Sequence, residues 1–527
     1  MINNSLLPEH QRIDGKIILK CDNVGNLLTK QAEENPQKLF LIFPDENETK
    51  FTYMEFKKIV DNVSSFLLQS GLKKNDKISL IFHNSPEFLI LYFACLSCGI
   101  IVVPINPDMS NTEIKFIIQD SDSKTVFFDK NLITKLNSIK NDLDNVTLIE
   151  IDSFTDPIFQ NNDTIEQLEV LLYDIAVIIY TSGTTGKPKG VMLSHLNLLS
   201  DSMSISNWFK FNKKTRCLCI LPLYHNNGQI TTLLAPLYAG GSTIIVRGKI
   251  SLYAFWFLIK KYEATWTSVM ASILSILLSL PQEREDKSLN AILCGGQKLS
   301  HNVQDQFENR FNVPIFEGFG LTETTSFSCI NNYPAEKRKV GTIGKPLQTN
   351  EMRIVDENDN EVGINEEGEI CIRGYNVSNG YLGNDEKNAH SFRNGWFHSG
   401  DFGLKDNDGY FYFYGRKDSL IIKGGENIYP SELENVLYQN SFIDECAVIG
   451  IPHKLLGEEI CAFVKCKNSN ILSENEIKLF CKNKIAEYKQ PKKIIIINNL
   501  TDLENIPKGP TKKVLYRKLK QYYENNF

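Results

Sequence analysis

The chain of 527 residues lacks features that mark several special classes of protein. It has no excess of positive charge, because its net charge is −6, and nothing in that balance favours a nucleic-acid partner. Its twelve cysteines follow no repeating frame. Cys95 and Cys98 lie in an apolar segment without a second pair, which favours buried thiols over a zinc site. Scattered thiols are typical of a reducing compartment, so we expect a cytoplasmic protein.

The sequence also lacks the usual marks of secretion and membrane insertion. Residues 1–5 contain no basic stretch followed by an apolar one, so no signal peptide is expected. The apolar run Phe88–Ile105 has eighteen residues, the length of a short membrane span. Gly99 and Pro104 interrupt it, which predicts a buried helix of about ten residues followed by a buried strand at Ile100–Val103. We therefore expect no transmembrane segment.

The remaining composition is that of an ordinary globular protein, with 42% hydrophobic and 23% charged residues. A chain of this length is too long for one hydrophobic core and predicts at least two domains. Segments with strand and helix patterns alternate, which indicates an α/β protein with a mostly parallel sheet covered on both faces. Strands are expected at Leu39–Phe43, Lys77–Phe82, Thr125–Phe128 and Ile175–Ile179. Helices are expected from residue 51 to about 69, after the caps at Ser85 and Ser110, and over residues 264–280.

The most informative stretch is Tyr180–Gly190, which reads Tyr-Thr-Ser-Gly-Thr-Thr-Gly-Lys-Pro-Lys-Gly. It follows an expected strand, and its glycines let the backbone turn tightly. Backbone N–H groups, four hydroxyls and the cations Lys187 and Lys189 then converge, an arrangement that suits a polyphosphate. The stretch is not a Walker A loop, which has four residues between its glycines and Ser or Thr after its Lys.

This stretch resembles the signature of the acyl-adenylate-forming enzymes, which include acyl-CoA synthetases, peptide-synthetase adenylation domains and firefly-type luciferases. Further motifs resembling that family follow in order at Leu221–Gln229, Ile292–Lys298, Phe316–Thr325, Gly395–Asp401 and Pro507–Leu519. The resemblance covers nearly the whole chain. It implies a large N-terminal domain, residues 1–417, of layered, mostly parallel sheets with helices and a strand-rich subdomain. It also implies a small, mobile α+β domain at residues 418–527.

The resemblance implies which residues bind the nucleotide. The Gly-rich loop would grip the β- and γ-phosphates of ATP, Phe319 would stack on adenine, and Thr322 would contact the α-phosphate. Glu323 and Thr181 would hold Mg²⁺, which prefers hard oxygen ligands. Asp401 would accept hydrogen bonds from the ribose hydroxyls, as a carboxylate does in dinucleotide folds. The implied nucleotide-binding residues are Thr181, Ser182, Gly183, Thr184, Thr185, Gly186, Lys187, Gly295, Gly296, Gln297, Glu317, Gly318, Phe319, Asp401 and Arg416.

The second motif places the acid. By resemblance His225 is a gate to the carboxylate site, and Val269 lies near the acyl pocket. Asn226 and Asn227 are polar where many fatty-acid enzymes are apolar. This pattern fits either a substrate with its own polar group or structural hydrogen bonding within the protein, and both alternatives stay open here.

The C-terminal domain would contribute the catalytic Lys513 and a thiolation face formed by Lys423, Gly424 and Gly425. Asp418 stands at the hinge position of the family. The final motif departs from the usual family pattern at Gly509, Lys512 and Tyr516, which replace Thr, Gly and Arg respectively.

The implied reaction has two halves: a carboxylic acid and ATP give acyl-AMP and pyrophosphate, and a thiol then displaces AMP. The run at 423–430 resembles that of acyl-CoA synthetases, and no Asp for a substrate ammonium lies between Leu221 and Tyr238. We therefore expect coenzyme A as the thiol, with a small-molecule acid and ATP as the other substrates. The alternatives are an enzyme that loads the phosphopantetheine of a carrier protein and a catalytically silent nucleotide-binding homologue.

Overall fold

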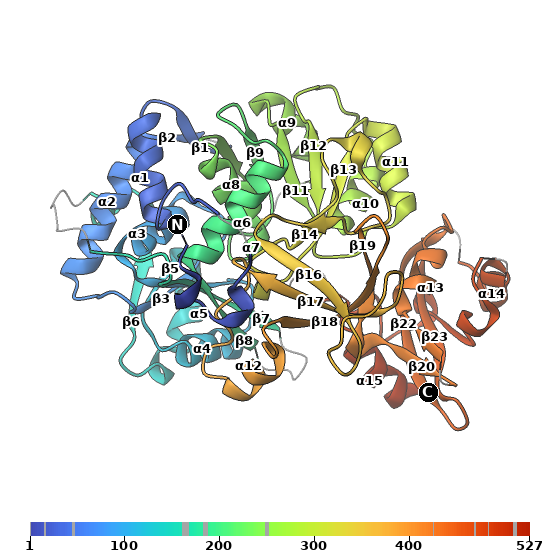
Figure 1. Ribbon diagram of the computed structural model, residues 1–527. Helices are drawn as coiled ribbons and strands as arrows, with labels where there is room; N and C mark the ends of the chain where they lie inside the picture. Colours follow the sequence, from blue (N-terminus) through green and yellow to red (C-terminus); the bar gives the residue numbers. More distant parts are fainter. Residues whose placement is uncertain are drawn as a thin grey trace. The chain divides into compact units, whose positions relative to one another are not determined.

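The computed structural model describes residues 2–14, 17–44, 48–160, 168–182, 188–247, 252–424, 426–467, 471–482, 484–509 and 514–527 (Figure 1). Seven expected site residues lie outside these ranges: Gly183, Thr184, Thr185, Gly186, Lys187, Gly425 and Lys513. The side chains of Ser182 and Asp418 are also outside the description. The chain forms two compact units. Unit 1 comprises Met1–Gly296, Phe307–Met352 and Cys371–His398, and unit 2 comprises Gln297–Gln306, Arg353–Ile370 and Ser399–Phe527.

Unit 1 contains a nine-stranded sheet whose six central strands are parallel. The outer strands β2, β14 and β15 run antiparallel to their neighbours. In the order of pairing, the strands are β15 (Lys345–Pro346), β14 (Cys329–Ile330), β13 (Ile315–Phe319), β12 (Ala291–Cys294), β11 (Trp266–Val269), β9 (Arg216–Cys219), β10 (Ser242–Ile245), β1 (Leu39–Phe43) and β2 (Thr49–Thr52).

A second, six-stranded sheet of unit 1 is parallel except for its last pair. Its strands pair in the order β6 (Thr147–Ile151), β5 (Ser123–Asp129), β3 (Lys77–Ile81), β4 (Ile101–Ile105), β7 (Ile175–Ser182) and β8 (Pro188–Ser194). All four strands expected in the first part of the chain are present. The expected α/β class is therefore confirmed.

A layer of helices lies between these two sheets (Figure 1). It consists of α1 (Val24–Glu34), α2 (Tyr53–Gln69), α3 (Pro86–Cys98), α6 (His195–Trp208) and α8 (Ala235–Tyr238). Helix α2 contacts β1 of one sheet, and α3 contacts β3 and β4 of the other. Because α3 is buried on nearly every side, its residues are apolar all around the helix. This packing explains the long apolar run of the sequence.

Local capping signals fix the ends of these helices as expected. The side chain of Ser85 accepts a hydrogen bond from the N–H of Phe88, Pro86 is the first helical residue, and Gly99 ends α3 with a φ of 68°. Ser110 and Glu113 form a capping box at the start of α4 (Asn111–Asp120). Helix α4 and the short α5 (Ile133–Asn137) contribute to the core on the other face of the six-stranded sheet.

One expected element is wrong. Residues 264–280 do not form a single helix: Trp266–Val269 is the strand β11, and only Ala271–Ser279 is helical, as α10. The strand pairs in parallel with β9 and β12. All four of its side chains are buried. A strand of four residues that is buried on both faces shows no clear alternation of exposed and buried positions, so periodicity alone cannot distinguish it from a buried helix.

The remaining helices of unit 1 include α7 (Asn226–Gln229), which continues through the π-helical turn η6 (Ile230–Leu234) into α8. The others are α9 (Phe255–Tyr262) and α12 (Asp385–Ser391). Helix α11 (His301–Phe311) has residues in both units.

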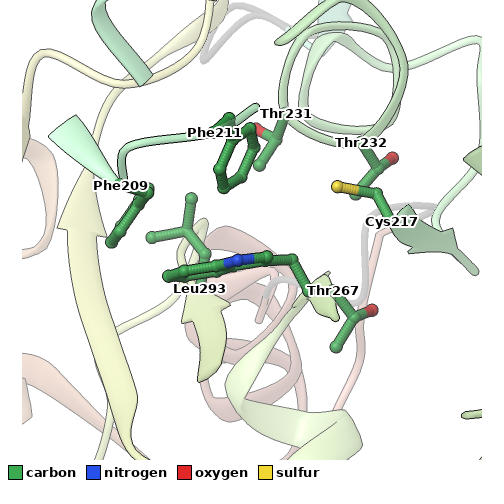
Figure 2. Close-up of a pocket in the computed structure, with 8 residues that line it drawn as sticks. Phe209, Phe211, Cys217, Thr231, Thr232, Thr267 and Leu293 are labelled. Carbon is green, nitrogen blue, oxygen red and sulfur yellow. The ribbon is translucent and has the colours of Figure 1, made fainter. Parts of the chain in front are cut away.

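A small cavity of about 10 Å³ lies beside η6 in unit 1 (Figure 2). Aromatic and threonine side chains make up most of its lining, which consists of Phe209, Phe211, Cys217, Thr231, Thr232, Trp266, Thr267 and Leu293. The Oγ1 atom of Thr231 has no hydrogen-bond partner among the described residues. The cavity has about the volume that one water molecule needs, so it does not accommodate an acid substrate.

Unit 2 holds most of a four-stranded sheet and a five-stranded sheet. The first pairs in the order β16 (Asn350–Val355), β17 (Gly368–Gly374), β18 (Phe397–Lys405) and β19 (Phe411–Arg416). The second pairs in the order β21 (Glu426–Ile428), β20 (Ile421–Lys423), β23 (Gly457–Cys466) and β22 (Ile443–His453), with β24 (Lys493–Ile496) also on β23.

The five-stranded sheet has an apolar core on each face, because its side chains alternate between the two. Cys446 and Val448 face a cluster that includes α13 (Pro430–Leu437) and α14 (Glu474–Lys482). Ala447 and Ile449 face a cluster that includes Leu519 of α15 (Tyr516–Asn526). The strands and the Ser473-capped helix expected here are confirmed. The domain boundary at residues 417 and 418 stays a prediction.

None of the helices in the described part of the chain combines the length and the apolar character that crossing a membrane requires.

Candidate active site

The Gly-rich stretch connects two strands of unit 1 that pair with each other. Thr181 on β7 lies opposite Lys189 on β8, and Ser182 lies opposite Pro188. Gly190 packs so closely on β7 that a Cβ atom there would lie 2.8 Å from the side chain of Ile178. The described residues on either side of the Gly-rich stretch therefore form a tightly packed strand pair, and the polyphosphate role of residues 183–187 stays a prediction.

A second loop, which follows β13, contacts this hairpin. Its short helix η8 (Thr322–Thr324) carries Thr322 and Glu323 and contacts β8. Glycine is required at position 320, two residues before η8, because a Cβ atom at this position would lie 1.6 Å from the carbonyl oxygen of Ser326. The two motifs expected to bind phosphate and Mg²⁺ are thus adjacent in unit 1.

Tyr381 fixes the carboxylate of Glu323. Its hydroxyl donates a hydrogen bond to Oε1 of Glu323 at 2.9 Å, and its ring lies 5.9 Å from the Nζ of Lys189. The backbone of Tyr381 is held by the side-chain amide of Asn388 through two hydrogen bonds, of 2.7 and 2.9 Å. An isolated bridge also pairs Tyr381 with Val191 of β8. This tyrosine therefore connects the Gly-rich hairpin to the carboxylate expected to hold the metal.

The residues expected near adenine lie at the ends of β12 and β13. A Cβ atom at Gly295 or Gly318 would lie 2.5 or 2.6 Å from the ring of Phe327, so both glycines make room for that side chain. Phe319, at the end of β13, is buried with 9% exposure. Gly296 has a φ of 80° and open space beside it. Glu317 is buried on β13, and Gln297 follows Gly296 as a half-buried residue assigned to unit 2.

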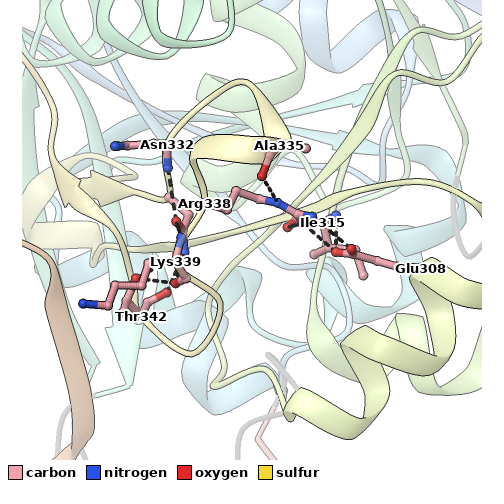
Figure 3. A network of polar contacts seen from close by, with 8 residues as sticks. Glu308, Ile315, Asn332, Ala335, Arg338, Lys339 and Thr342 are labelled. Atoms are coloured by element: carbon pink, nitrogen blue, oxygen red, sulfur yellow. Dashed lines mark hydrogen bonds and ion pairs between the residues drawn. The ribbon is translucent and has the colours of Figure 1, made fainter.

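A polar network holds strand β13 in place (Figure 3). The guanidinium of Arg338 makes two bonds to the carboxylate of Glu308, at 2.6 and 3.0 Å, and a third to the carbonyl of Ile315. The N–H of Ile315 donates to the same carboxylate at 2.9 Å, and the guanidinium lies over the ring of Phe316. Bidentate pairs of this kind fix orientation as well as position, so the strand that leads to Phe319 is rigidly placed.

The residues expected at the acid site lie at the start of α7 and the end of β11. His225 and both asparagines are half-buried, whereas Val269 is fully buried. Asn226 Nδ2 donates hydrogen bonds to the carbonyls of Thr325 and Leu321. Asn227 instead accepts a hydrogen bond from the hydroxyl of Ser268, at 2.8 Å. Both asparagines thus have structural partners, but on different elements.

In unit 2, strand pairing brings together the two residues expected at the ribose. Asp401 on β18 lies opposite Arg416 on β19, and Arg416 Nε is 3.5 Å from Asp401 Oδ1. Asp401 is 3% exposed, whereas the side chain of Arg416 is 48% exposed. The two oxygens of a buried carboxylate can accept hydrogen bonds from two hydroxyls, and the guanidinium beside it is partly exposed.

The expected thiolation face lies on the hairpin of β20 and β21. The ammonium of Lys423 forms an ion pair with Glu459 at 2.6 Å, and both side chains are mostly buried. Gly424 has a φ of 62°, which favours glycine, and its N–H donates to the carbonyl of Leu456 at 2.8 Å. Lys423 therefore supports this turn from within, whereas Gly424 shapes its backbone.

Residues 510–513, which include Lys513, lie outside the described ranges, whereas residues up to Gly509 and from Val514 onward are described. Lys508 and Val514 of the final motif form an antiparallel bridge. Tyr516, which departs from the usual Arg, donates a hydrogen bond to Glu434 at 3.0 Å. Burial raises the pKa of Glu434 to about 7. Tyr516 therefore has a packing role at the start of α15.

Three features were not evident from the sequence: the contact of Tyr381 with Glu323, the contact of Asn226 with Thr325, and that of Tyr516 with Glu434. Each joins residues that are 58 or more positions apart. The periodicity of a sequence indicates only which residues of one helix or strand share a face, so it cannot predict contacts over such separations. The family resemblance marked the motifs but not these contacts.

Residues 28–382 match the AMP-binding enzyme family, and residues 432–505 match the AMP-binding enzyme C-terminal domain. The chain belongs to the AMP-binding enzyme family. This confirms the resemblance noted in the sequence.

Several relatives in the family are similar along almost their whole length. Oxalate–CoA ligase of Arabidopsis thaliana is 32% identical, with 96% of this chain and 99% of the relative covered. Sulfoacetate–CoA ligase of Cupriavidus necator is 30% identical, with 94% and 97% covered. The structure of o-succinylbenzoate CoA synthetase from Bacillus subtilis with ATP and magnesium ion is 28% identical, with a TM-score of 0.82 and 94% and 99% covered.

As an AMP-binding enzyme with CoA-ligase relatives, the protein is an AMP-forming acid–CoA ligase that uses ATP and coenzyme A. The acid is activated as an acyl-adenylate and then transferred to CoA. Activation is needed because an ionised carboxylate is a poor electrophile, whereas AMP is a good leaving group.

Proposed function

We propose that the acid is short and carries a second polar or charged group. The carrying observation is the side chain of Asn227, which is half-buried beside His225. Its Oδ1 accepts a hydrogen bond from Ser268, and its Nδ2 has no hydrogen-bond acceptor within the described ranges. A polar group of the substrate can accept from that donor, whereas an alkyl chain would leave it unsatisfied. Two relatives whose names specify oxalate and sulfoacetate support this choice.

Paired acids test the proposal. AMP release in the presence of CoA is measured for sulfoacetate against 3,3-dimethylbutanoate, which has a similar shape but no sulfonate, and for oxalate against propanoate. We expect a higher kcat/KM for the polar member of each pair. Asn227→Leu should narrow the difference by roughly tenfold, the value of one hydrogen bond in a desolvated site. A higher kcat/KM for the apolar acid of each pair, with the same ratio in Asn227→Leu, would contradict the proposal.

The chemistry of unit 1 fits a divalent metal. Glu323 offers a half-buried carboxylate that Tyr381 orients through Oε1, and Thr181 offers a hydroxyl at the end of β7. Glu323 and Thr181 would hold Mg²⁺, since hard cations prefer such oxygens. Bound Mg²⁺ screens the negative charge of the phosphates. A relative solved in complex with ATP and magnesium ion supports the use of Mg²⁺ together with ATP.

The other roles concern binding and alignment. Thr322 contacts the α-phosphate, Phe319 stacks on adenine, and Asp401 with Arg416 binds the ribose. The Gly-rich stretch, with Ser182 and residues 183–187, binds the β- and γ-phosphates. His225 borders the carboxylate. Alignment of two anions and screening of their repulsion account for most of the catalysis in such phosphoryl chemistry.

The C-terminal segment serves the two half-reactions in turn. Lys513 acts in adenylation and the turn at 424–425 in thioester formation, and rotation about Asp418 exchanges them. A bulky residue at Gly425 should block transfer to CoA and spare pyrophosphate release, and an equal loss in both half-reactions would contradict this division. The alternative is that the phosphopantetheine thiol of a carrier protein accepts the acyl group. Full turnover with free CoA would exclude this alternative.

We also place the enzyme in the cytoplasm. All twelve cysteines are free thiols, and all but Cys21 are buried. Such thiols are typical of a reducing compartment. Fractionation of the native cells tests this location, and recovery outside the cytoplasmic fraction would contradict it.

A further inference from the structure

The loop that carries Thr322 and Glu323 ends in an unfavourable backbone turn. Thr325 has φ 65° and ψ −64°, a combination that a β-branched residue rarely adopts. The N–H of Ser326 donates to the carbonyl of Thr324 at 2.8 Å, so Thr325 is the central residue of a γ-turn. Such a turn persists only where the surrounding structure holds it, and turns of this kind cluster at functional sites.

Hydrogen bonds to two residues outside the loop, Asn376 and Asn226, hold this turn. The hydroxyl of Thr325 donates to the carbonyl of Asn376 at 2.6 Å in a buried position. The amide of Asn226 donates to the carbonyl of Thr325 and, at 3.5 Å, to that of Leu321. Leu321 and Thr325 flank η8 on either side. One amide group therefore joins both ends of the segment that carries Thr322 and Glu323.

The neighbouring asparagine provides a contrast. The side chain of Asn227 accepts a hydrogen bond from Ser268 on β11 and makes no hydrogen bond to the η8 loop within the described ranges. Both asparagines begin α7, directly after His225. Of the two asparagines, therefore, Asn226 is the one whose side chain is hydrogen-bonded, in the described part of the chain, to the loop expected to bind Mg·ATP.

We propose that Asn226 is a positioning residue for Mg·ATP, which acts by holding the strained turn at Thr325, and that it does not select the acid. The inference rests on the proposed roles of Thr322 and Glu323. It resolves the two alternatives for the asparagine pair: Asn226 is structural and serves the nucleotide, and Asn227 faces the acid.

Binding of Mg·ATP without acid, measured by calorimetry on the full chain, tests the inference. Asn226→Leu keeps the branched shape of the side chain but removes the donor. We expect it to weaken Mg·ATP binding by roughly tenfold, the scale of one buried hydrogen bond, and to leave the kcat/KM ratio of sulfoacetate to 3,3-dimethylbutanoate unchanged. Asn227→Leu, the matched control, should change that ratio and leave Mg·ATP binding within about twofold. Asn226→Ala, a smaller change, carries the same expectation if the leucine variant does not fold.

A double-mutant cycle tests the mechanism through the turn. Glycine adopts a positive φ without strain, so Asn226→Leu should weaken binding less in a Thr325→Gly background than in the parent. If Asn226→Leu weakens Mg·ATP binding by the same factor in both backgrounds, the two substitutions act independently. That result would overturn the idea that Asn226 acts through Thr325.

Glu323→Gln separates this inference from the proposed metal role. Weaker Mg·ATP binding in Glu323→Gln, with unchanged binding in Asn226→Leu, would overturn the inference alone. Unchanged binding in Glu323→Gln would overturn the metal role and the inference together.

Discussion

Tyr381→Phe isolates the hydrogen bond that orients the expected metal ligand. The ring of Tyr381 is 5% exposed and its backbone is held by Asn388, so phenylalanine fits the same space without a new cavity. The Nζ of Lys189, 5.9 Å from the ring, keeps its position over an aromatic face. The substitution therefore removes one O–H group, which donates to Oε1 of Glu323 at 2.9 Å.

The size of the effect follows from that contact. A hydrogen bond to a charged group contributes about 1.5–3 kcal/mol, and the lower end applies because Glu323 is only half-buried. If the bond serves to place the carboxylate for Mg²⁺, the half-saturating Mg²⁺ concentration should rise by roughly tenfold. Acid-dependent pyrophosphate release, titrated with Mg²⁺ at saturating ATP and acid, measures this shift.

Two controls make the result decisive. The KM of the acid should stay within about twofold, because Tyr381 has no proposed contact with it. The unfolding temperature should also remain close to that of the parent, which shows that the ring still packs. A Mg²⁺ titration that overlays the parent's, at unchanged turnover, would refute the orienting role of Tyr381.

Three further predictions address unit 2. Asp401→Ala should weaken ATP binding by about 1.5–3 kcal/mol and leave acid binding unchanged, because it removes a buried hydrogen-bond acceptor. If calorimetry shows weaker binding of the acid but not of ATP, the ribose role is contradicted. Lys513→Ala should slow adenylation by on the order of 10²–10³-fold, while thioester formation from supplied acyl-AMP stays nearly normal. An equal loss of rate in both half-reactions would argue against alternation of the C-terminal domain. A loss of adenylation in Lys512→Ala but not in Lys513→Ala would assign the catalytic role to Lys512. Because the pKa of Glu434 is raised to about 7, its contribution to stability is complete below pH 4.5 and is lost as the pH rises through 7. The difference in unfolding free energy between the parent and Glu434→Gln should therefore change by roughly 1–2 kcal/mol over this range, less than the full shift would give because the residue keeps some solvent contact. If that difference in unfolding free energy does not vary with pH, Glu434 is not protonated in the folded protein. Tyr516→Phe should make the variation with pH larger, because it removes a hydrogen-bond donor to the ionised carboxylate.

Local signals predicted much of the fold. The cap at Ser85, Pro86 at the first helical position and Gly99 at the end define α3 without reference to the rest of the chain. The strand Trp266–Val269 could not be found in this way. Its state depends on pairing with β9 and β12, and a fully buried strand has no polar face to reveal its period.

The site shows the same division. The motifs identified Glu323 and Asp401 as candidates, and the structure places Asp401 beside Arg416 through the register of β18 and β19. The hydroxyl that orients Glu323 comes from Tyr381, 58 residues later. Two polar neighbours, Asn226 and Asn227, looked alike in the sequence, because their separate partners are visible only once β11 and the η8 loop are placed in space.

The central claim is that the acid is activated as an adenylate before it meets the thiol. Mass spectrometry of the enzyme with sulfoacetate, ATP and Mg²⁺, first without CoA and then after CoA is added, tests it most directly. The account predicts acyl-AMP and one equivalent of pyrophosphate before CoA, and conversion of that acyl-AMP to acyl-CoA and AMP afterwards. Release of ADP and phosphate, or acyl-CoA formed from ATP while added acyl-AMP is not consumed, would contradict it.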